Sequence, residues 1–438
     1  MRKLSLVLGL CVSLVAAGAA TAWAASNENA DVQMLMQEVK ALKAKLAEMD
    51  QLKKQVAELE KKLGESNKKQ EKLAERSART EEVLITKAEK PSINIGGALR
   101  FNYRDSSFND AQKAKGGDGL FDIFRLNVDG KYNDLIISAE YRWYSYMNVI
   151  HHGWIGYDFT ENTQGQVGVT KVPFGLLPYA SHNYWFGVPY YLGLADDYDM
   201  GAKLKYTPGP WDLRFAFFKN GEWGSPSDLD RYSFDVVTVG DQQNEETNTI
   251  NARVAYTFKP AKDTSIEVGV SGLVGQLYNN TTDGFGTRWA AGPHAKAQFG
   301  PFGVEAEAIW YQYDPNNPAG ISDDTVLLGA FGSSYLVASE ATVLVGNLSY
   351  DVPVEWGPVT GLQFYNDFST SLKDQSGWAD SYINTLGCLI SSGPVYTYVD
   401  LVMGKNMVWL GGPSDALAQG DPDAEWTAMF NVNVGYYF

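Results

Sequence analysis

The sequence is poor in cysteine, histidine and positive charge, and it lacks repeated long hydrophobic runs. Its 438 residues include two cysteines and four histidines. A bundle of membrane helices needs several apolar runs of about twenty residues, and a mean hydropathy of −0.25 excludes that class. Lysine and arginine number 36 against 52 aspartates and glutamates, for a net charge of −16. This balance argues against a nucleic-acid partner.

The N-terminal segment predicts a secretory signal peptide over residues 1–24. Two basic residues follow the initiator methionine, an apolar run comes next, and an Ala-Trp-Ala cleavage signal ends the segment. A lipoprotein modified at Cys11 is the alternative, but Leu10 stands where a small residue is needed. Cleavage would leave Cys388 as the sole cysteine, so an exported mature chain has no internal disulfide. Cys388 lies in an apolar, strand-like run and is interpreted as a buried or lipid-facing residue.

Residues 31–85 predict an α-helical coiled coil about 80 Å long at roughly 1.5 Å per residue. The segment has no aromatic residue, proline or cysteine, and apolar residues recur in alternating steps of three and four. One shortened step, from Met49 to Leu52, is a stammer. A coiled coil needs partner helices, so we expect a homo-oligomer, with two or three strands left open. A single helix lying on a membrane is the alternative, but the apolar stripe is narrow and lacks aromatic residues. The expected domain spans residues 25–90.

From Pro91 onward the hydrophobic period changes to two. Every Tyr and Phe, and every Trp except Trp23, lies in residues 91–438. Alternation of apolar and polar residues predicts strands with one apolar face and one polar face. Sixteen strands are expected near residues 92–104, 121–132, 135–146, 150–159, 165–172, 199–206, 211–219, 249–258, 265–275, 285–299, 303–313, 342–351, 359–369, 381–391, 395–405 and 426–438.

The connections between these strands alternate between short turns and long loops. This pattern is typical of a transmembrane barrel, and only helices or closed barrels pair every backbone group in lipid. The predicted fold is therefore all-β, a sixteen-stranded antiparallel transmembrane β-barrel preceded by the coiled coil. A soluble β-sandwich or propeller is the alternative. Two irregularities remain: residues 326–341 are apolar enough for a further strand, and Pro293 predicts a bulge.

Several segments of this half carry a resemblance to a known family. They are Ile93-x-Ile95-x-Gly97-x-Leu99-Arg100, the runs 124–130 and 153–157, the run Gln166 to Gly175, and the aromatic C-terminal strand ending at Phe438. Together with the exported coiled coil, the chain resembles the phosphate-selective porin O and P family and its dicarboxylate-channel relatives. The resemblance implies a homotrimer of sixteen-stranded barrels in a Gram-negative outer membrane, in contact with lipid and lipopolysaccharide, with the coiled coil in the periplasm. It also implies that Phe438 belongs to the signal for barrel assembly.

Alternate residues of a strand point to opposite faces of the wall, and this alternation identifies the candidate pore residues. If the apolar positions face lipid, the opposite positions face the lumen, and a set of basic residues there would lower the barrier to anions. Cross-strand ion pairing is the alternative for each of them. The predicted pore-lining residues are Arg100, Arg104, Arg125, Arg142, Lys203, Lys205, Arg214, Arg253, Arg288 and Lys296.

The segment from residue 171 to residue 199 is too apolar for a solvated loop. We expect it to fold into the lumen as a constriction, with packing against a neighbouring subunit as the alternative. Its candidate site residues are Tyr179, Trp185, Tyr190, Tyr191, Asp196 and Asp197. The closing aspartates depart from what a phosphate filter requires, so the family name does not settle the solute.

The sequence predicts no catalytic residues, no metal site and no cofactor. His151 and His152 are adjacent in a strand and are expected to point to opposite faces, where they cannot share a metal. The expected function is passive diffusion of small hydrophilic solutes with a mild anion preference, of the phosphate or dicarboxylate class. The alternatives are a carbohydrate-type porin, and an envelope tether that uses the coiled coil.

Overall fold

The computed structural model describes residues 40, 53–54, 56–58, 60–74, 91–222 and 224–438. The chain divides into two units, Met1–Ala88 and Glu89–Phe438. The described residues of the first unit are all helical and exposed. The predicted signal peptide lies outside the described residues, and the predicted coiled coil falls largely outside them. No helix in the described part of the chain is long and apolar enough to cross a membrane.

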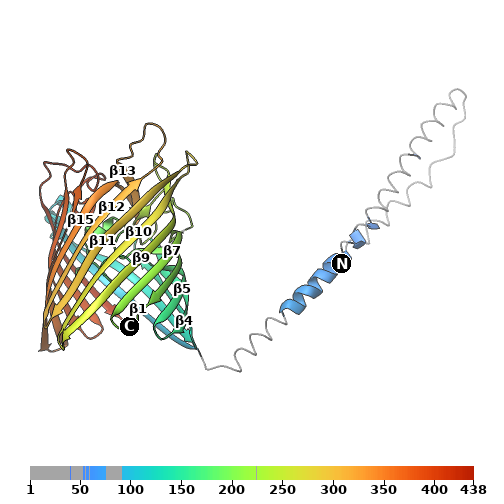
Figure 1. Ribbon diagram of the computed structural model, residues 1–438, viewed down its shortest axis with the longest axis horizontal. Helices are drawn as coiled ribbons and strands as arrows, with labels where there is room; N and C mark the ends of the chain where they lie inside the picture. Colours follow the sequence, from blue (N-terminus) through green and yellow to red (C-terminus); the bar gives the residue numbers. More distant parts are fainter. Residues whose placement is uncertain (1–39, 41–52, 55, 59, 75–90, 223) are drawn as a thin grey trace, which may run out of the picture. The chain divides into compact units, whose positions relative to one another are not determined.

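The second unit is a closed barrel of sixteen antiparallel strands (Figure 1). Each of the sixteen predicted strands has a counterpart in the structure, so the predicted fold class is confirmed for the barrel. The last strand pairs with the first, with Ala98 opposite Tyr437, and the Gly97 N–H donates to the Phe438 carbonyl at 2.8 Å. The barrel strands are β1 (Ser92–Ser106), β2 (Asp118–Tyr132), β3 (Leu135–Tyr144), β4 (Asn148–Thr160), β5 (Thr163–Lys171), β6 (Tyr198–Tyr206), β7 (Trp211–Gly221), β9 (Asn244–Ala261), β10 (Thr264–Asn279), β11 (Phe285–Phe299), β12 (Phe302–Asp314), β15 (Glu340–Trp356), β16 (Val359–Lys373), β17 (Ser381–Ser392), β18 (Val395–Lys405) and β19 (Thr427–Tyr437).

One rim of the barrel has only short turns, such as Asn133-Asp134 and Gly393-Pro394, while the other rim carries the long connections. Figure 1 shows the long connections gathered at the upper end. They contain the remaining short elements, which are the helices α2 (Asp110–Lys115) and α3 (Val188–Tyr191), the 3-10 helix η1 (Val408–Leu410), and the strands β8 (Asp235–Val236), β13 (Thr325–Ala330) and β14 (Ser333–Ala338).

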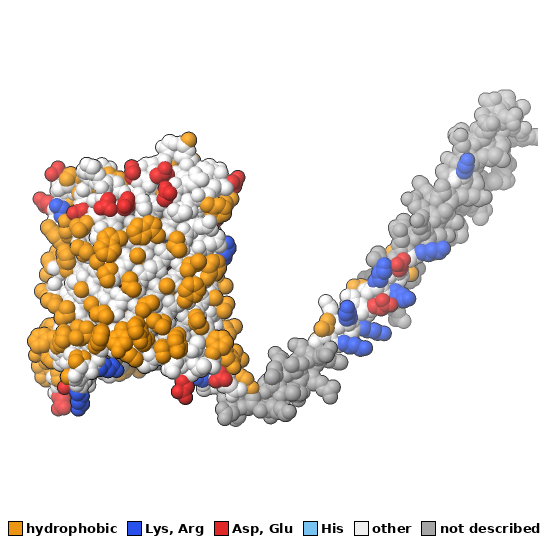
Figure 2. Space-filling view, viewed as in Figure 1, with side chains coloured by type: hydrophobic (Ala, Val, Ile, Leu, Met, Phe, Trp, Pro, Cys, Tyr) orange, Lys and Arg blue, Asp and Glu red, His pale blue; other side chains and the backbone are white. Residues whose placement is uncertain are grey.

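The two faces of the wall differ as the alternating sequence predicts. In β10, Val270 and Val274 are 53% and 54% exposed, whereas Ser271 between them is 3% exposed. Figure 2 shows the outward apolar side chains as a band around the visible side of the barrel, with acidic side chains above it at the long-connection rim. Cys388 shares the outward parity of exposed Leu386 and is half-buried. Polar and charged side chains of the opposite parity are therefore turned inward.

Two local expectations need correction. Pro293 causes no bulge, because β11 keeps one register with β10, where Pro293 lies opposite Val270. Its register with β12 is also unshifted, but pairs are absent at Gly292 and Pro293, where proline has no N–H to donate. Residues 326–341 do not form a further barrel strand over their length. They form the β13–β14 hairpin, which joins β8 in a separate three-stranded sheet, and only their end enters β15.

The long connections share one apolar core. It includes Tyr190, Phe234, Leu328, Tyr335 and Leu417, which come from four different connections and are all at most 6% exposed. Aromatic contacts join these segments, as between Phe234 and Tyr335, whose ring centroids are 5.5 Å apart. The long connections therefore form a compact cap on one end of the barrel and are not independent solvated loops.

The close approach of β11 to β12 gives the first prediction. A Cβ on Gly292 would overlap the carbonyl oxygen of Ala308, whereas a Cβ on Gly346 in β15 would meet nothing within 4 Å. We expect Gly292→Val to lower the free energy of unfolding by about 1–3 kcal/mol or more, since overpacking forces the backbone apart. The folded fraction on semi-native gels, measured against temperature, reports the change. Gly346→Val is the control, and equal effects of the two variants would contradict the prediction.

Candidate functional site

The connection of residues 172–197 lies inside the barrel and reaches its opposite wall. It leaves β5 and returns as β6, yet the Val188 N–H donates to Ser369 Oγ of β16 at 2.8 Å. In the ring order, β16 is the eighth strand from β5 in a ring of sixteen. The same connection contacts the first strands, because the Tyr184 hydroxyl donates to Asp122 Oδ1 of β2 at 2.8 Å. The segment thus crosses the interior of the barrel.

Side chains of the wall hold this connection by its backbone. Ser271 Oγ accepts from the Gly175 N–H at 3.0 Å, and Arg253 Nε donates to the Gly175 carbonyl at 2.9 Å. Asn347 of β15 donates to the Ala180 carbonyl at 3.0 Å. Such bonds satisfy backbone groups that have no ladder partner. They come from β9, β10 and β15 and fix the path of the chain.

Asp367 of β16 is the strongest single attachment. Its Oδ2 accepts from the His182 and Asn183 backbone N–H groups at 2.7 and 3.0 Å and from Asn183 Nδ2 at 2.8 Å. Its Oδ1 lies 2.7 Å from His182 Nδ1. Glu305 is 4.0 Å from the other ring nitrogen. Burial disfavours the charged imidazole and so lowers the pKa of His182, and Lys296 acts in the same direction. The hydrogen bond and negative charge of Asp367, together with the charge of Glu305, outweigh both and raise the pKa of His182 above its usual value.

The six predicted residues of this connection divide into two groups. Tyr179 is 44% exposed and Trp185 is half-buried, so both present ring surface to the interior. Tyr190, Tyr191, Asp196 and Asp197 are buried at 4–6% exposure. The two tyrosines pack in the cap core, where the Tyr191 carbonyl accepts from the Tyr335 hydroxyl at 2.6 Å.

The last two acids of the segment have different surroundings. Asp196 Oδ1 pairs with Lys171 Nζ at 2.5 Å, and its Oδ2 accepts from the Tyr232 hydroxyl at 2.5 Å. Burial and the negative charges of Asp235 and Glu246 raise the pKa of Asp197 well above its usual value. Asp196 is therefore neutralised by a neighbouring cation, whereas Asp197 lies in an excess of negative charge.

Seven of the ten predicted basic residues form ion pairs with carboxylates of the wall. Two arginines share one acid: Arg142 Nε and Arg125 approach Glu140 Oε1 at 2.5 and 3.5 Å. Arg253, only 1% exposed, contacts Asp212 at 3.0 Å and Glu267 at 2.6 Å. The other pairs are Arg100–Asp122 at 2.8 Å, Arg214–Asp212 at 2.8 Å, Arg288–Glu246 at 2.5 Å and Lys296–Glu305 at 2.7 Å.

Arg104, Lys203 and Lys205 form no ion pair with any described residue. The Arg104 guanidinium lies 5.7 Å from the Trp185 ring centroid, a cation–π geometry. Lys203 Nζ donates to the Lys171 carbonyl at 2.7 Å. Lys205 lies two residues further along the inward face of β6 and is partly exposed. Among the predicted residues, these three are the ones without a carboxylate partner in the described part of the chain.

The charges inside the barrel are unevenly distributed around it. Seven of the ten predicted basic residues are on β1 to β7, and none is on β12 to β19. The wall formed by β12 to β18 carries inward acids, namely Glu305, Glu307, Asp367 and Asp400, all at most 6% exposed. The sector from β12 to β18 therefore has buried acids and none of the predicted bases, whereas the sector from β1 to β7 has bases that are mostly paired with acids of the same sector.

His151 and His152 correct a prediction. A register shift between β3 and β4 lies beside them, so both rings are turned inward, with their Nδ1 atoms 2.9 Å apart. Ligand atoms of Glu140 and the two histidines lie within 4.8 Å of one another, a donor set that suits a transition metal. However, Arg125 and Arg142 already pair with Glu140, and their charge opposes a cation. Residue parity alone missed this cluster, because a bulge shifts the alternation by one residue.

The attachment of His182 to Asp367 generates a pH-dependence prediction. The pKa of His182 is raised in the folded protein, so the charged imidazole paired with Asp367 stabilises the fold. This contribution is fully present below about pH 6.5 and is lost as the pH rises through the folded pKa. Asp367→Asn removes the charge but leaves the burial, so we expect the pKa of His182 to fall below its usual value. NMR titration of the imidazole, with hydrogen exchange across residues 180–190, measures both effects. An unchanged pKa in Asp367→Asn would contradict this account.

Comparison with known proteins shows the fold but no family. No family model matches the chain, and no characterised protein matches it in sequence. Among solved structures, similarity with a TM-score of 0.50 is found to in-vitro-folded OmpT, an outer membrane protein of Vibrio cholerae in a trimer form (13% identity), the outer membrane channel DcaP of Acinetobacter baumannii (14%) and an anion-selective porin from Comamonas acidovorans (12%). Each match covers 80% of this chain and 97–100% of the other. The chain therefore has the sixteen-stranded barrel fold found in outer-membrane channels and porins.

Proposed function

We propose that the protein is an outer-membrane porin, a passive diffusion channel for small hydrophilic solutes. The observation that carries the proposal is the closed barrel itself, apolar outside and charged inside, with the connection of residues 172–197 crossing its interior as a constriction. A closed barrel satisfies every backbone group in lipid, and the exposed apolar band would face lipid and lipopolysaccharide. Shared fold with an outer membrane channel and a porin supports the same function.

The solute class follows from the charges that are not paired. Arg104 of β1 and Lys203 and Lys205 of β6 form no ion pairs in the described structure, so they favour anions such as phosphate or a dicarboxylate. Asp196 at the end of the constriction is paired with Lys171, so it does not repel an incoming anion. We infer a mild anion preference, within the phosphate-selective porin class that the sequence resembles.

Planar-bilayer recording tests the channel function directly. The purified full chain should insert with large ohmic conductance steps, grouped in threes for a homotrimer. Liposome flux with phosphate, succinate and maltose then discriminates an anion channel from a carbohydrate-type porin, which partly exposed Tyr179 and Trp185 would also suit. A folded protein that stays electrically silent and passes no solute would exclude the proposal.

Neutralising an unpaired interior base gives the selectivity prediction. We expect Lys205→Gln to reduce the anion-to-cation permeability ratio by about twofold or more, because Lys205 forms no ion pair with any described residue and its charge acts on a passing ion. Reversal potentials in a KCl gradient measure the ratio. Lys262→Gln is the matched control, since it removes the same charge from an exposed residue in the short turn between β9 and β10. Equal shifts for both variants would show that net charge alone sets the selectivity.

We further propose that residues 25–90 form a periplasmic coiled coil that helps to hold a trimer together, with an envelope-tether role as the alternative. The chain divides into separate units at Ala88/Glu89, so the barrel should not depend on the helix for its fold.

Deletion of residues 31–85 tests this division of roles. We expect the single-channel conductance to be retained and the temperature at which the oligomer dissociates to fall, because only the helical contacts are lost. Conductance recordings and oligomer mobility on semi-native gels provide the readouts. A folded deletion variant without conductance would contradict the independence of the barrel.

A further inference from the structure

Three aspartates gather where the constriction segment meets the cap. Asp197 ends the connection of residues 172–197, Asp199 lies at the start of β6, and Asp235 lies in β8. Carboxylate oxygens of the three lie within 4.8 Å of one another. The residues are 6%, 2% and 2% exposed, respectively. Three carboxylates so close together in a buried site repel one another strongly unless something compensates their charge.

The cluster also has oxygen atoms with no hydrogen-bond partner. The Asp199 side chain makes no hydrogen bond or ion pair with any described residue, and its Oδ1 is buried. Asp197 Oδ1 and Glu222 Oε2, on a neighbouring buried acid, are likewise unsatisfied. Buried carboxylate oxygens are normally hydrogen-bonded or metal-bound. The unpartnered oxygens of Asp197 and Asp199 therefore indicate a missing positive ligand.

The nearby cations do not supply this charge. Arg231 donates to Asp235 Oδ2 at 2.9 Å and to two backbone carbonyls. Arg288 pairs with Glu246 at 2.5 Å. With Glu222 counted, five buried acids share two guanidinium groups that are already engaged, which leaves a formal excess of three negative charges.

We propose that Asp197, Asp199 and Asp235 bind a calcium ion. Ca²⁺ takes six to eight oxygen ligands at about 2.3–2.6 Å, so oxygens on opposite sides of one ion are about 4.6–5.2 Å apart. The carboxylate oxygens, all within 4.8 Å of one another, are close enough to bind one such ion. Mg²⁺ needs a tighter octahedron and keeps several waters, and the all-oxygen donor set disfavours zinc.

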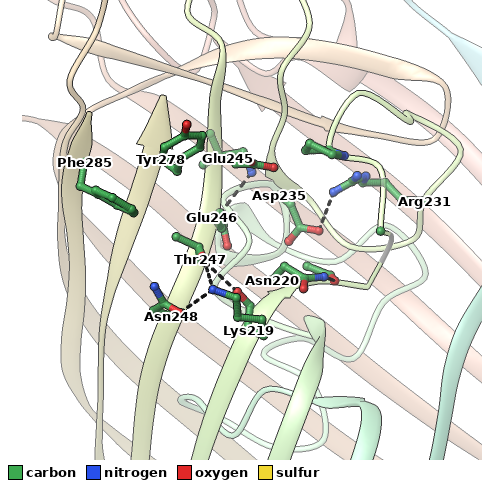
Figure 3. A pocket seen from close by; sticks show the side chains of 14 residues that line it. Lys219, Asn220, Arg231, Asp235, Glu245, Glu246, Thr247, Asn248, Tyr278 and Phe285 are labelled. Atoms are coloured by element: carbon green, nitrogen blue, oxygen red, sulfur yellow. Dashed lines mark hydrogen bonds and ion pairs between the residues drawn. The ribbon is translucent and has the colours of Figure 1, made fainter. Parts of the chain in front are cut away.

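An adjoining cavity gives such an ion access. A cavity of about 320 Å³ is lined by Asp235 and Glu246 together with residues from the ends of β7, β9, β10 and β11. Figure 3 shows the Asp235 and Glu246 carboxylates on neighbouring walls of this cavity, with Arg231 bound to Asp235. Glu246, whose Oε2 is unsatisfied, adds negative charge to the wall of this cavity and would attract a cation towards the cluster.

The ion would join two separate parts of the structure. Asp197 and Asp199 belong to the constriction segment and the barrel wall, whereas Asp235 belongs to the sheet of the cap through the pairing of β8 with β13. Bound calcium would thus fasten the cap to the constriction. This inference is independent of which solute the barrel passes.

Isothermal titration with CaCl₂ tests the site in the full-length protein, purified in detergent free of lipopolysaccharide and stripped with EDTA. We expect one calcium ion per chain for the wild type, and affinity at least tenfold weaker for Asp199→Asn. Asp241→Asn is the matched control, because it removes an exposed carboxylate from the same connection as Asp235. No calcium binding by the wild type, or equal binding by Asp199→Asn, would overturn the proposal.

Thermal unfolding provides a second measurement that does not depend on the strength of the titration signal. In EDTA, Asp199→Asn should melt above the wild type, because one repelling charge is gone. In calcium the order should reverse, since only the wild type gains from the ion. If the wild type melts at the same temperature in both buffers, and infrared spectra show a protonated carboxyl, then shared protons stabilise the cluster and the calcium site is excluded.

Discussion

Closure of the sheet is the constraint on which the rest of the structure depends. Each edge strand of an open sheet would leave a row of unpaired N–H and C=O groups, which lipid cannot satisfy. Here β1 and β19 pair along nine residues, from Ala98–Tyr437 to Ser106–Met429, and the terminal Phe438 is tied back to Gly97. Once the ring is closed, the parity of every strand is fixed, because a shift of one residue would exchange its inner and outer faces.

The alternation of the strands turns many charged side chains into the barrel, and their charges must be compensated by nearby charges of opposite sign. Seven of the ten inward bases have carboxylate partners, and Arg253, almost fully buried, has two. Inward side chains have a second role, because Arg253 and Asp367 bind the backbone of the crossing connection. Polar side chains of the wall therefore hold both the wall and the segment that crosses it. Around Asp199 the negative charges exceed the positive ones, and the proposed calcium ion would compensate the excess.

The sequence predicted the parts of the structure that follow from local periodicity. All sixteen barrel strands were found, because most of them alternate apolar and polar residues over about ten residues. The errors fall where the period is interrupted. At His151 and His152 a bulge turns both rings inward, and at Pro293 the chain loses hydrogen bonds without gaining a residue. The apolar run of residues 326–341 was ambiguous, because alternation does not reveal whether a strand joins the wall or the cap.

The site was harder to predict than the fold, because it depends on register and on contacts between distant segments. Parity placed Arg142 and Glu140 on the same face, but only the pairing of β2 with β3 brings Arg125 to the same carboxylate. Nothing local distinguishes Tyr179, which is exposed, from Tyr190, which is buried in the cap core.

The proposed channel shows why net charge is a poor guide to ion selectivity. The excess of acids in the whole chain includes residues of the long connections and acids that are already paired inside the barrel, and neither group adds fully to the field along a permeation path. What acts on a passing ion is the charge that remains uncompensated within about a Debye length of it. On the inner wall, Arg104, Lys203 and Lys205 form no ion pair in the described structure, whereas the β12 to β18 sector carries buried acids, of which Glu305 is paired with Lys296 and Asp367 with His182. An anion would therefore be attracted most strongly to Arg104 and Lys205, which form no ion pair in the described structure and are partly exposed.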